Sequence, residues 1–373
     1  MEKEFRVLIV GGGIAGMSLA ICLGEMGVST ELIDKDPEWK ALGTGITITG
    51  PTFRAFSALG VESEVRRLGA TNERVKLFQP PEKFIGEIGP PETIPPLPNN
   101  GGILRPVLHK ILSDRTLAVG VKVSLGKSIS FLSQESKFVD VRFVGGGSGR
   151  FDLVVGADGA FSELRTLVFP EASEPTLTGQ GCFRHLTDKP ADVDCLHMFV
   201  GGAVKTGVTP CSSNQMYLFC NAPMPGNPRW DPKDDWKKLR ELLIGYEGVV
   251  GSVREALGPQ SNIVYRPLEN FLMNPPWYRG RVVLIGDAAH ATTPHLAAGA
   301  MMAVEDALVL SELIGSAVSL DTALEAFMDR RFERCRHVVE NSRTLGQYEL
   351  DGVSPVEHKQ LQEESWQRMA API

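Results

Sequence analysis

The chain has 373 residues, enough for two domains or for one large domain with an inserted piece. Apolar residues make up 43% and charged residues 22%, which is typical of a soluble globular protein. Its 38 Lys and Arg stand against 45 Asp and Glu, and the basic residues form no block. The net charge of −7 therefore argues against nucleic acid and membrane surfaces as partners.

The six cysteines form no Cys-x-x-Cys pair, and no Cys/His cluster has zinc spacing. We expect reduced, mostly buried thiols, a cytoplasmic location and no metal site. Residues 7–24 carry no charge and could be mistaken for a signal peptide or a membrane span. Because Gly11, Gly12 and Gly13 interrupt this stretch, a buried strand followed by a buried helix is the better interpretation.

The start of the chain predicts a βαβ unit. Residues 5–10 (FRVLIV) form a continuous apolar run, as expected of a parallel strand covered on both faces. Residues 14–27 have helical spacing that stops at Gly27. Residues 29–34 (STELID) then predict the next strand.

The following segments predict strands and loops. Residues 90–102 contain too many prolines for a helix or strand and predict a loop. Residues 121–126 predict a strand, and residues 137–143 alternate like a half-buried one. Residues 144–150 (VGGGSGR) predict a hairpin turn, after which residues 151–159 (FDLVVGADG) return as a buried strand.

The second half changes character twice. Residues 171–270 predict an antiparallel sheet, interrupted by one charged helix at residues 233–246. Residues 281–307 begin as an apolar strand, turn at Gly286-Asp287 and run through small residues. From residue 303 onward the three-four spacing of apolar residues predicts helices with a buried face.

A glycine motif follows the first strand. Gly11, Gly13 and Gly16 supply Gly-x-Gly-x-x-Gly between a strand and a helix, where a tight turn lets a pyrophosphate approach the helix N-terminus. Asp34 ends the next strand, where a carboxylate would take ribose hydroxyls; the alternative is a solvated turn acid. This motif predicts a dinucleotide but does not separate FAD from NAD.

Three further segments favour FAD. Arg105 stands at the start of a predicted helix within residues 102–112, and Asp158-Gly159 is followed by Ser162 and Arg165. The third segment, residues 281–307, carries Asp287 and then a stretch of Ala, Gly and Pro that leaves room for something flat. Each segment alone can be structural, but a plain NAD dehydrogenase would not explain all three.

In these motifs the chain resembles the single-component FAD-dependent aromatic hydroxylases, from residue 7 to about residue 345. The resemblance implies an α/β fold: an FAD-binding Rossmann-like βαβ domain, an inserted antiparallel-sheet substrate domain and C-terminal helices. The implied FAD domain is discontinuous, with residues 1–70, 101–170 and 271–345. The implied substrate domain comprises residues 71–100 and 171–270, and residues 346–373 form a helical tail.

The resemblance also implies which residues hold FAD. In that family the glycines and the acid matching Asp34 hold the ADP half, and the residues matching Arg105 and Asp287 contact the ribityl region. The full implied set is Gly11, Gly13, Ile14, Ala15, Gly16, Asp34, Lys35, Gly45, Arg105, Asp158, Asp287, Pro294, Ala298, Gly299 and Ala300. This chain departs from the family in having Ala297-Ala298-Gly299 for Gly-x-Gly and Met301 for a frequent Asn or Gly.

Shorter segments are similar to the pyridine-ring members of the family. These are residues 208–224, 43–46 and 294–300. The resemblance implies an NAD(P)H-dependent monooxygenase that hydroxylates a small, acidic aromatic or N-heteroaromatic ring with O2, through a flavin C4a-hydroperoxide. We expect NADPH or NADH as co-substrate, and a monomer or homodimer.

Substrate contacts are expected on the predicted sheet. Tyr217 is expected to orient the ring, Lys205 to pair with a substrate carboxylate and Arg184 to lie near the flavin. Pro294 and His295 are expected near the reacting edge. Each has a structural alternative: a half-buried sheet tyrosine, a solvated lysine or arginine, a loop histidine. His290 is interpreted as loop support and His197 as a core histidine.

Other activities remain open on the same scaffold. A flavin-dependent reductase cannot be separated by sequence, and a halogenase of the tryptophan type would carry a Trp-x-Trp-x-Ile-Pro signature that is missing here. A flavin-binding module without turnover is a further alternative. It would bind FAD tightly and show no substrate-stimulated NAD(P)H oxidation.

Overall fold

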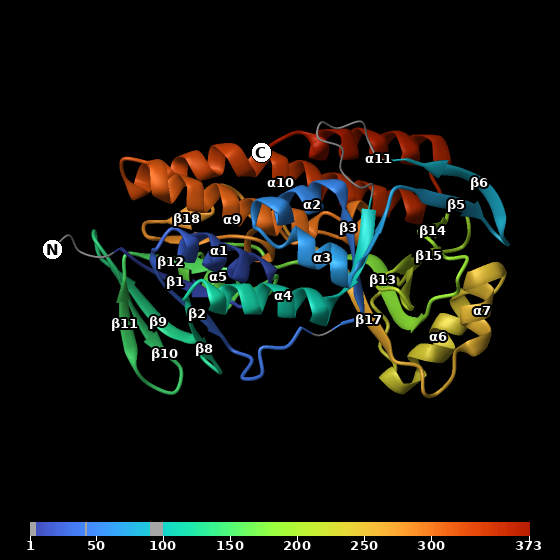
Figure 1. Cartoon of the computed structure of the whole chain (residues 1–373), viewed down its shortest axis with the longest axis horizontal. Coiled ribbons are helices and arrows are strands. Elements are labelled where there is room, and N and C mark those ends of the chain that lie inside the picture. The colour runs from blue at the N-terminus through green and yellow to red at the C-terminus, as the bar shows by residue number, and fades with distance from the viewer. Residues whose placement is uncertain (1–4, 42, 90–99) are drawn as a thin grey trace.

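The computed structural model describes residues 5–41, 43–89 and 100–373. One half is built around a six-stranded sheet in the order β18-β19-β12-β1-β2-β8 (Figure 1). The apolar run at the N-terminus is its central strand β1, which confirms the prediction of a buried parallel strand. The strands are β1 (Arg6–Val10), β2 (Ser29–Asp34), β8 (Lys122–Leu125), β12 (Leu153–Gly156), β18 (Tyr278–Arg279) and β19 (Val282–Leu284).

Helix α1 (Ile14–Glu25) confirms the helix of the βαβ unit and explains the missing charges. It packs against both α4 (Arg105–Ala118) and α9 (Gly299–Ser316). A helix covered on several sides has no polar face, so its apolar residues need no periodicity. Gly27, at φ +73°, follows the helix in a left-handed conformation that suits glycine.

The hairpin prediction needs one correction. Strand β10 (Val139–Phe143) pairs with β9 (Ile129–Gln134) and turns back into β11 (Ser148–Phe151). The apolar residues that follow do not return in this hairpin. They form β12, which lies between β1 and β19 in the parallel sheet, and this explains why the segment is uniformly buried.

The other half contains a seven-stranded sheet in the order β17-β13-β16-β15-β14-β5-β6. Its pairs are antiparallel, as predicted, except that β14 and β5 run parallel. In the segment 71–100, residues 71–89 lie within the described residues and include β5 and β6, which join this sheet. The strands are β5 (Val75–Gln79), β6 (Lys83–Ile88), β13 (Thr176–Asp188), β14 (Leu196–Phe199), β15 (Lys205–Pro210), β16 (Gln215–Pro223) and β17 (Ile263–Asn270).

One face of this sheet is covered by helices. The predicted charged helix is shorter than expected, because it consists of η1 (Pro232–Asp234) and α6 (Asp235–Leu242). A second helix, α7 (Gly248–Ala256), was not predicted because it is short and contains two glycines, Gly248 and Gly251, which disfavour a helix. Leu239 and Leu243 near α6 and Val250 and Val253 of α7 form a core with the sheet.

A small sheet lies between the two halves. It has the order β3-β7-β4, with β3 (Gly45–Thr49), β7 (Asn100–Leu104) and β4 (Ala70–Asn72). Between β3 and β4 the chain forms two helices, α2 (Gly50–Ala58) and α3 (Glu62–Leu68). The predicted loop at residues 90–102 was wrong at its end, because residues 100–102 belong to β7. Residues 90–99 lie outside the described residues.

The chain is helical from residue 303 onward, as predicted. It contains α8 (Asp287–His290), η2 (Pro294–Leu296), α9, α10 (Leu320–Asp351) and α11 (Pro355–Ala370); α5 (Glu163–Val168) lies earlier in the chain. The 32 residues of α10 span about 48 Å and run along both halves (Figure 1). The helical tail expected from residue 346 therefore begins inside α10.

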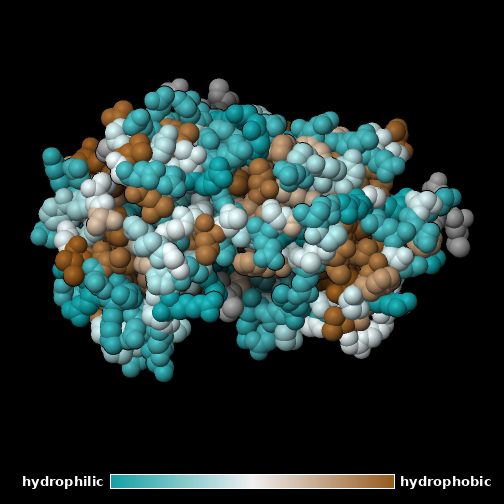
Figure 2. All heavy atoms as spheres, turned by 180° about the vertical axis from the view of Figure 1, so that it is seen from behind, coloured by the Kyte–Doolittle hydropathy of each residue, from teal (hydrophilic) through white to brown (hydrophobic). Residues whose placement is uncertain are grey.

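The surface is mixed. The face seen in Figure 2 is largely hydrophilic, with hydrophobic residues in scattered patches. Among the described residues, none of the helices has the length and apolar character needed to cross a membrane.

Candidate active site

A cavity of about 1100 Å³ lies between the parallel sheet and the seven-stranded sheet. Strands β1, β2, β12 and β19 end at its wall, and in open parallel sheets ligands bind at this carboxyl edge. The same cavity continues along the face of the seven-stranded sheet that α6 and α7 do not cover. It therefore joins the predicted cofactor residues to the predicted substrate residues.

The glycine motif forms one end of the cavity. Gly11 has φ +107°, and Gly16 packs so tightly that a Cβ there would overlap the Gly11 carbonyl oxygen. Gly13 differs, because a Cβ on it would meet no atom within 4 Å and would point into open space. The backbone at Gly13 is thus free to approach a pyrophosphate, as the motif requires.

Asp34 lies at the same end. Its Oδ2 accepts a hydrogen bond from Gly12 N at 2.6 Å, and its Oδ1 accepts one from Asp36 N at 2.8 Å. Trp39 Nε1 donates to the Gly12 carbonyl at 2.9 Å. The carboxylate that the sequence assigned to ribose binding therefore also fixes the glycine loop, and it lines the cavity.

Two opposite charges face the middle of the cavity. Arg105 begins α4 and Asp287 begins α8, and the structure shows no hydrogen bond or ion pair of either side chain with another described residue. Burial raises the pKa of Asp287, while burial and the nearby Arg184 lower that of Arg105. Asp287 is accessible to solvent and both side chains line the cavity, so both groups are poised for a polar ligand.

The start of α9 forms the floor beside Asp287. Pro294, Ala298, Gly299 and Ala300 line the cavity, and their small side chains leave its wall flat. Ala297 has φ +51°, a left-handed conformation that turns η2 into α9. The first N–H groups of α9 lack intrahelical partners and can face a flat ring carrying negative charge.

These features fit FAD. The open backbone at Gly13 fits a pyrophosphate, Asp34 fits a ribose, and the unpaired Arg105 and Asp287 fit a hydroxylated chain. The small-residue wall before α9 fits an isoalloxazine ring. Ile14, Ala15 and Gly45 also line the cavity.

The substrate residues share one face of the seven-stranded sheet. Residues paired across neighbouring strands point to the same side, and Lys205 pairs with Asn221 while Arg184 pairs with Phe219. Tyr217 is two residues before Phe219 and points the same way, so the cavity is lined by all of them. The intervening residues Phe183, Leu218 and Cys220 face the core with α6 and α7.

Tyr217 is fixed in the cavity wall. Its hydroxyl bonds to Thr47 Oγ1, and its ring lies against Gly45, where a Cβ would overlap it. Burial raises the pKa of the phenol, so it is neutral at physiological pH. The hydroxyl is thus held in place as a donor or acceptor near the floor formed by α9.

Lys205 is not free in this structure. Its Nζ lies 3.1 Å from Glu349 Oε1, and both side chains are largely buried, at 9% and 15% exposed. His295 Nε2 lies 3.2 Å from Glu349 Oε2, and Thr293 Oγ1 lies 2.8 Å from His295 Nδ1. Sequence reasoning missed Glu349 because nothing in the helical pattern near residue 349 marks it as the partner of a cavity residue.

Two predicted FAD residues point elsewhere. Lys35 is exposed and pairs with Glu163 at 3.3 Å, so its side chain does not line the cavity. Asp158 caps α5: its Oδ1 accepts from the Ser162 hydroxyl and its Oδ2 from Leu164 N at 3.0 Å. The neighbouring Gly159 lines the cavity, so the segment is correctly placed although the carboxylate is used structurally.

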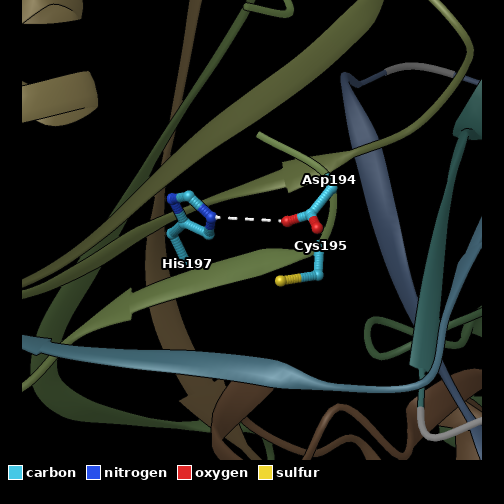
Figure 3. A group of neighbouring side chains, drawn as sticks. All are labelled: Asp194, Cys195 and His197. Atoms are coloured by element: carbon cyan, nitrogen blue, oxygen red, sulfur yellow. Dashed lines mark ion pairs between the residues drawn. The ribbon is translucent and has the colours of Figure 1, made fainter. Parts of the chain in front are cut away.

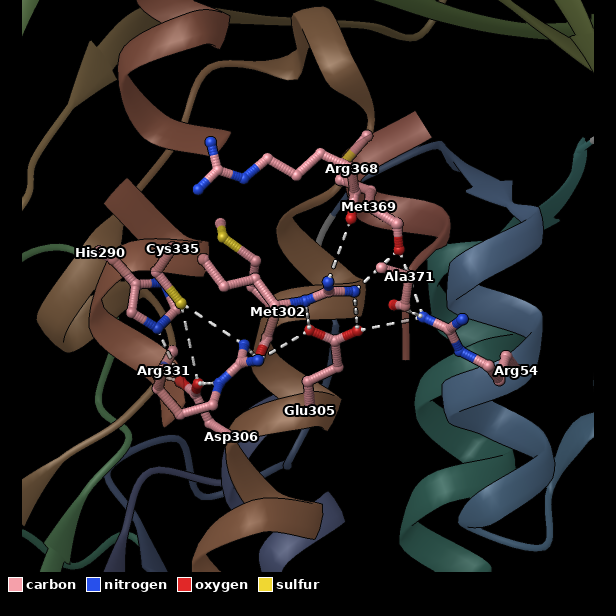
Figure 4. Close-up of polar contacts among 12 residues, drawn as sticks. Arg54, His290, Met302, Glu305, Asp306, Arg331, Cys335, Arg368, Met369 and Ala371 are labelled. Carbon is pink, nitrogen blue, oxygen red and sulfur yellow. Dashed lines mark hydrogen bonds and ion pairs between the residues drawn. The ribbon is translucent and has the colours of Figure 1, made fainter. Parts of the chain in front are cut away.

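A buried ion network lies behind the floor (Figure 4). Asp306 Oδ2 accepts from Gly286 N at 2.8 Å and pairs with His290 Nε2 at 2.6 Å, while its Oδ1 pairs with Arg331 at 2.8 Å. His290 therefore supports the loop, in agreement with the prediction. Because Gly286 precedes Asp287, this network fixes the turn that presents the cavity carboxylate.

The network continues to the C-terminus. Glu305 pairs with Arg331 at 2.8 Å and with Arg334 at 2.7 Å (Figure 4). Arg334 and Arg54 donate to carbonyl oxygens of Met369 and Ala370, which end α11. These bonds dock α11, whose Gln362 and Trp366 close one side of the cavity.

A second cluster of ligand-type side chains contains Asp194, Cys195 and His197 (Figure 3). Lys76 lies 2.8 Å from Asp194, and this ammonium with Arg74 holds the pKa of the carboxyl below its usual range. Burial raises the pKa of Cys195 to about 11, so its thiol stays protonated. The arrangement suits an ion pair joining β5 to β14 better than a metal.

Comparisons with known proteins agree with this geometry. Residues 4–342 match the model of the family described as FAD binding domain. A Bacillus subtilis protein whose name places it among FAD-dependent monooxygenases is 31% identical over 350 residues, covering 93% of this chain and 94% of that one. The 2-heptyl-3-hydroxy-4(1H)-quinolone synthase of Pseudomonas aeruginosa is 29% identical over 91% of this chain and 88% of its own.

The fold is shared with a solved structure. The Klebsiella pneumoniae protein HpxO, complexed with FAD and uric acid, superposes with a TM-score of 0.85 at 22% identity. The match covers 99% of this chain and 96% of that one.

Proposed function

The chain belongs to the FAD binding domain family and is an FAD-dependent monooxygenase, and we propose that the cavity described above is its active site. FAD lies between the glycine motif and α9, and the ring to be hydroxylated lies against the seven-stranded sheet. The substrate is a small aromatic or N-heteroaromatic ring, and the co-substrates are NAD(P)H and O2. The two halves of the molecule correspond to the FAD domain and the substrate domain.

One observation carries this proposal: a single cavity contains both sets of residues. Gly13, Asp34, Arg105 and Asp287 line it together with Tyr217 and the residues at the start of α9. A dinucleotide module without turnover would need no second polar wall. The exposed sheet face supplies such a wall within reach of the expected flavin ring.

FAD, when bound, supplies the redox chemistry: it accepts electrons from NAD(P)H and activates O2. The residues of the chain bind and orient. Arg105 and Arg184 place positive charge beside the flavin, and the α9 N-terminus stabilises negative charge on its ring. Asp287 accepts hydrogen bonds from hydroxyls of the ribityl chain.

Tyr217 and the floor formed by the start of α9 together position the substrate. The phenol, fixed by Thr47, presents one polar atom to a ring hydroxyl or ring nitrogen. Pro294 and His295 close the floor near the reacting edge, and Trp366 and Gln362 of α11 help to exclude water.

The six free cysteines are consistent with a cytoplasmic location. We propose a monomer or homodimer.

The test is a substrate screen with the purified protein. It should be yellow, and denaturation should release FAD. NAD(P)H oxidation should accelerate when the right hydroxylated benzoate, pyridine or quinolone is added, and labelled O2 should place one oxygen atom in the product. A protein that cannot be reconstituted with FAD, or label that arrives from water, would refute the proposal.

A further inference from the structure

Lys205 carries a positive charge into the substrate end of the cavity, and this charge is already neutralised. Its Nζ lies 3.1 Å from Glu349 Oε1, and 9% of its side chain is exposed. A buried ammonium next to an aromatic substrate would ordinarily attract a carboxylate. Here that carboxylate is part of the protein.

Glu349 is held in place by several donors. Its Oε2 accepts from Gln180 Nε2 at 3.0 Å and from His295 Nε2 at 3.2 Å. His358 Nε2 lies 3.5 Å from Oε1. Because an ionised carboxylate only accepts hydrogen bonds, this set of donors matches the charged form of Glu349.

The helix that carries Glu349 approaches the cavity closely. One turn earlier, a Cβ on Gly346 would lie 2.7 Å from Gln180 Oε1 and 2.9 Å from His295 Cε1. A residue with a side chain at position 346 would push α10 away from both partners. Glycine at this position therefore lets α10 bring its carboxylate to Lys205.

The local charges sum to zero. Burial works against charge on Glu349, but Lys205 and His295 hold its pKa below the usual range. Burial lowers the pKa of His295, although Glu349 opposes this, so the imidazole is neutral at physiological pH. One ammonium, one carboxylate and a neutral imidazole leave this cluster without net charge.

Two other cations of the cavity wall, Arg105 and Arg184, are assigned to its cofactor side, while Lys40 and Arg266 also line the cavity. Arg184 acts electrostatically on Arg105 and on Tyr217, two residues that lie along the expected flavin. In the proposed function these two arginines offset the negative charge of the phosphates and the reduced flavin. An anion entering the cavity beside Lys205 would meet an ammonium whose charge is already offset by Glu349, 3.1 Å away, and the two negative charges would repel.

We propose that Glu349 is a specificity-determining residue, which neutralises Lys205 and so restricts the enzyme to rings that bring no carboxylate to this end of the cavity. The inference rests on the proposed function, and it replaces the acidic substrate expected from the sequence with an uncharged ring. Specificity here arises from an internal repulsive group as much as from attraction.

Two probes test the inference, because they differ only in a carboxylate: 2-hydroxypyridine and 6-hydroxynicotinate. Their dissociation constants are measured on the FAD-loaded protein from changes in the flavin absorption spectrum. The wild type should bind 6-hydroxynicotinate at least about tenfold more weakly. Glu349→Gln keeps the shape, frees Lys205 and should strengthen 6-hydroxynicotinate binding about ten- to a hundredfold, the range of one buried charge-assisted hydrogen bond.

The controls separate charge from structure. Binding of 2-hydroxypyridine to Glu349→Gln should stay within about threefold, and adding Lys205→Met should abolish the gain for 6-hydroxynicotinate. Glu340→Gln makes the same change on the same helix at an exposed residue that pairs with Arg336, and it should alter neither constant.

Three results would overturn the inference. The first is a wild type that binds 6-hydroxynicotinate more tightly than 2-hydroxypyridine, and this result can be measured without any variant. The others are a Glu349→Gln protein that gains nothing for that probe or gains equally for both. If the protein binds FAD and oxidises NAD(P)H but gives one of these results, the inference about Glu349 fails alone. Failure to bind FAD would instead refute the proposed function.

Discussion

Alanine at Gly16 and alanine at Gly13 should damage the protein in different ways. A Cβ on Gly16 would overlap the Gly11 carbonyl oxygen and lie 3.3 Å from Ile9 Cγ2. Helix α1 would have to move away from β1 by roughly 1 Å to restore normal contact. Overpacking of this kind costs about 1–3 kcal/mol, so Gly16→Ala should lower the stability of the apoprotein by that amount.

Gly13→Ala should spare the apoprotein. Its Cβ would meet no atom within 4 Å, and the backbone, at φ −80°, accepts any residue. The new methyl group would instead occupy the place where the backbone must approach the pyrophosphate. Loss of one charge-assisted hydrogen bond, about 1.5–3 kcal/mol, predicts a dissociation constant for FAD about ten- to a hundredfold higher.

Two measurements distinguish these effects. Urea unfolding of the apoprotein reports the change in stability, and quenching of FAD fluorescence reports the dissociation constant. The reasoning would be refuted if both variants lost stability equally, or if Gly13→Ala bound FAD like the wild type. The first result would mean that Gly13 is packed, and the second that the pyrophosphate lies elsewhere.

Three further predictions concern the floor of the cavity. Asp287→Ala should raise the dissociation constant for FAD about ten- to a hundredfold in a folded protein; unchanged affinity would remove Asp287 from the site. Asp306→Asn should destabilise by about 3–5 kcal/mol. Burial opposes ionisation of Asp306, but His290 and Arg331 hold its pKa at about 2. In the wild type the stability that ionised Asp306 contributes is therefore present above pH 4 and is lost as the pH falls toward 2. Unfolding curves of the variant should not show this loss of stability between pH 4 and pH 2. Ala297→Gly should raise the free energy of unfolding by up to about 1 kcal/mol, because glycine relieves the left-handed strain. A lower free energy of unfolding, measured by urea denaturation, would contradict this.

The cofactor end could be predicted from the sequence because its signals are local. A strand, a glycine turn and a helix follow one another within residues 6–25, and each glycine has a steric reason visible in the motif. Asp34 ends the next strand, and parallel strands place their carboxyl ends at one edge. The roles of Arg105 and Asp287 were implied by the family resemblance, with Arg105 at the start of a predicted helix and Asp287 at the end of a predicted strand.

The remainder depends on contacts distant in sequence. Gln180 donates to Glu349 across 169 positions, and no periodicity along α10 distinguishes a glutamate with buried partners from a solvated one. For Asp158 the bonds that the sequence did not predict are local. Its carboxylate makes local bonds to Ser162 and Leu164, which cap a short helix, and the motif alone does not show that these bonds use the side chain.

Helix α10 connects the two regions that sequence reasoning treated separately. Arg331 fixes the helix to Asp306 and Glu305 behind the flavin floor, and Glu349 lies 18 residues later, about 27 Å along the same helix. Because breaking a buried ion pair is strongly destabilising, the network resists any sliding of α10. A shift of one residue would turn Glu349 by about 100° away from Lys205. The buried ions behind the flavin floor thus set the register that places Glu349 beside Lys205 at the substrate end.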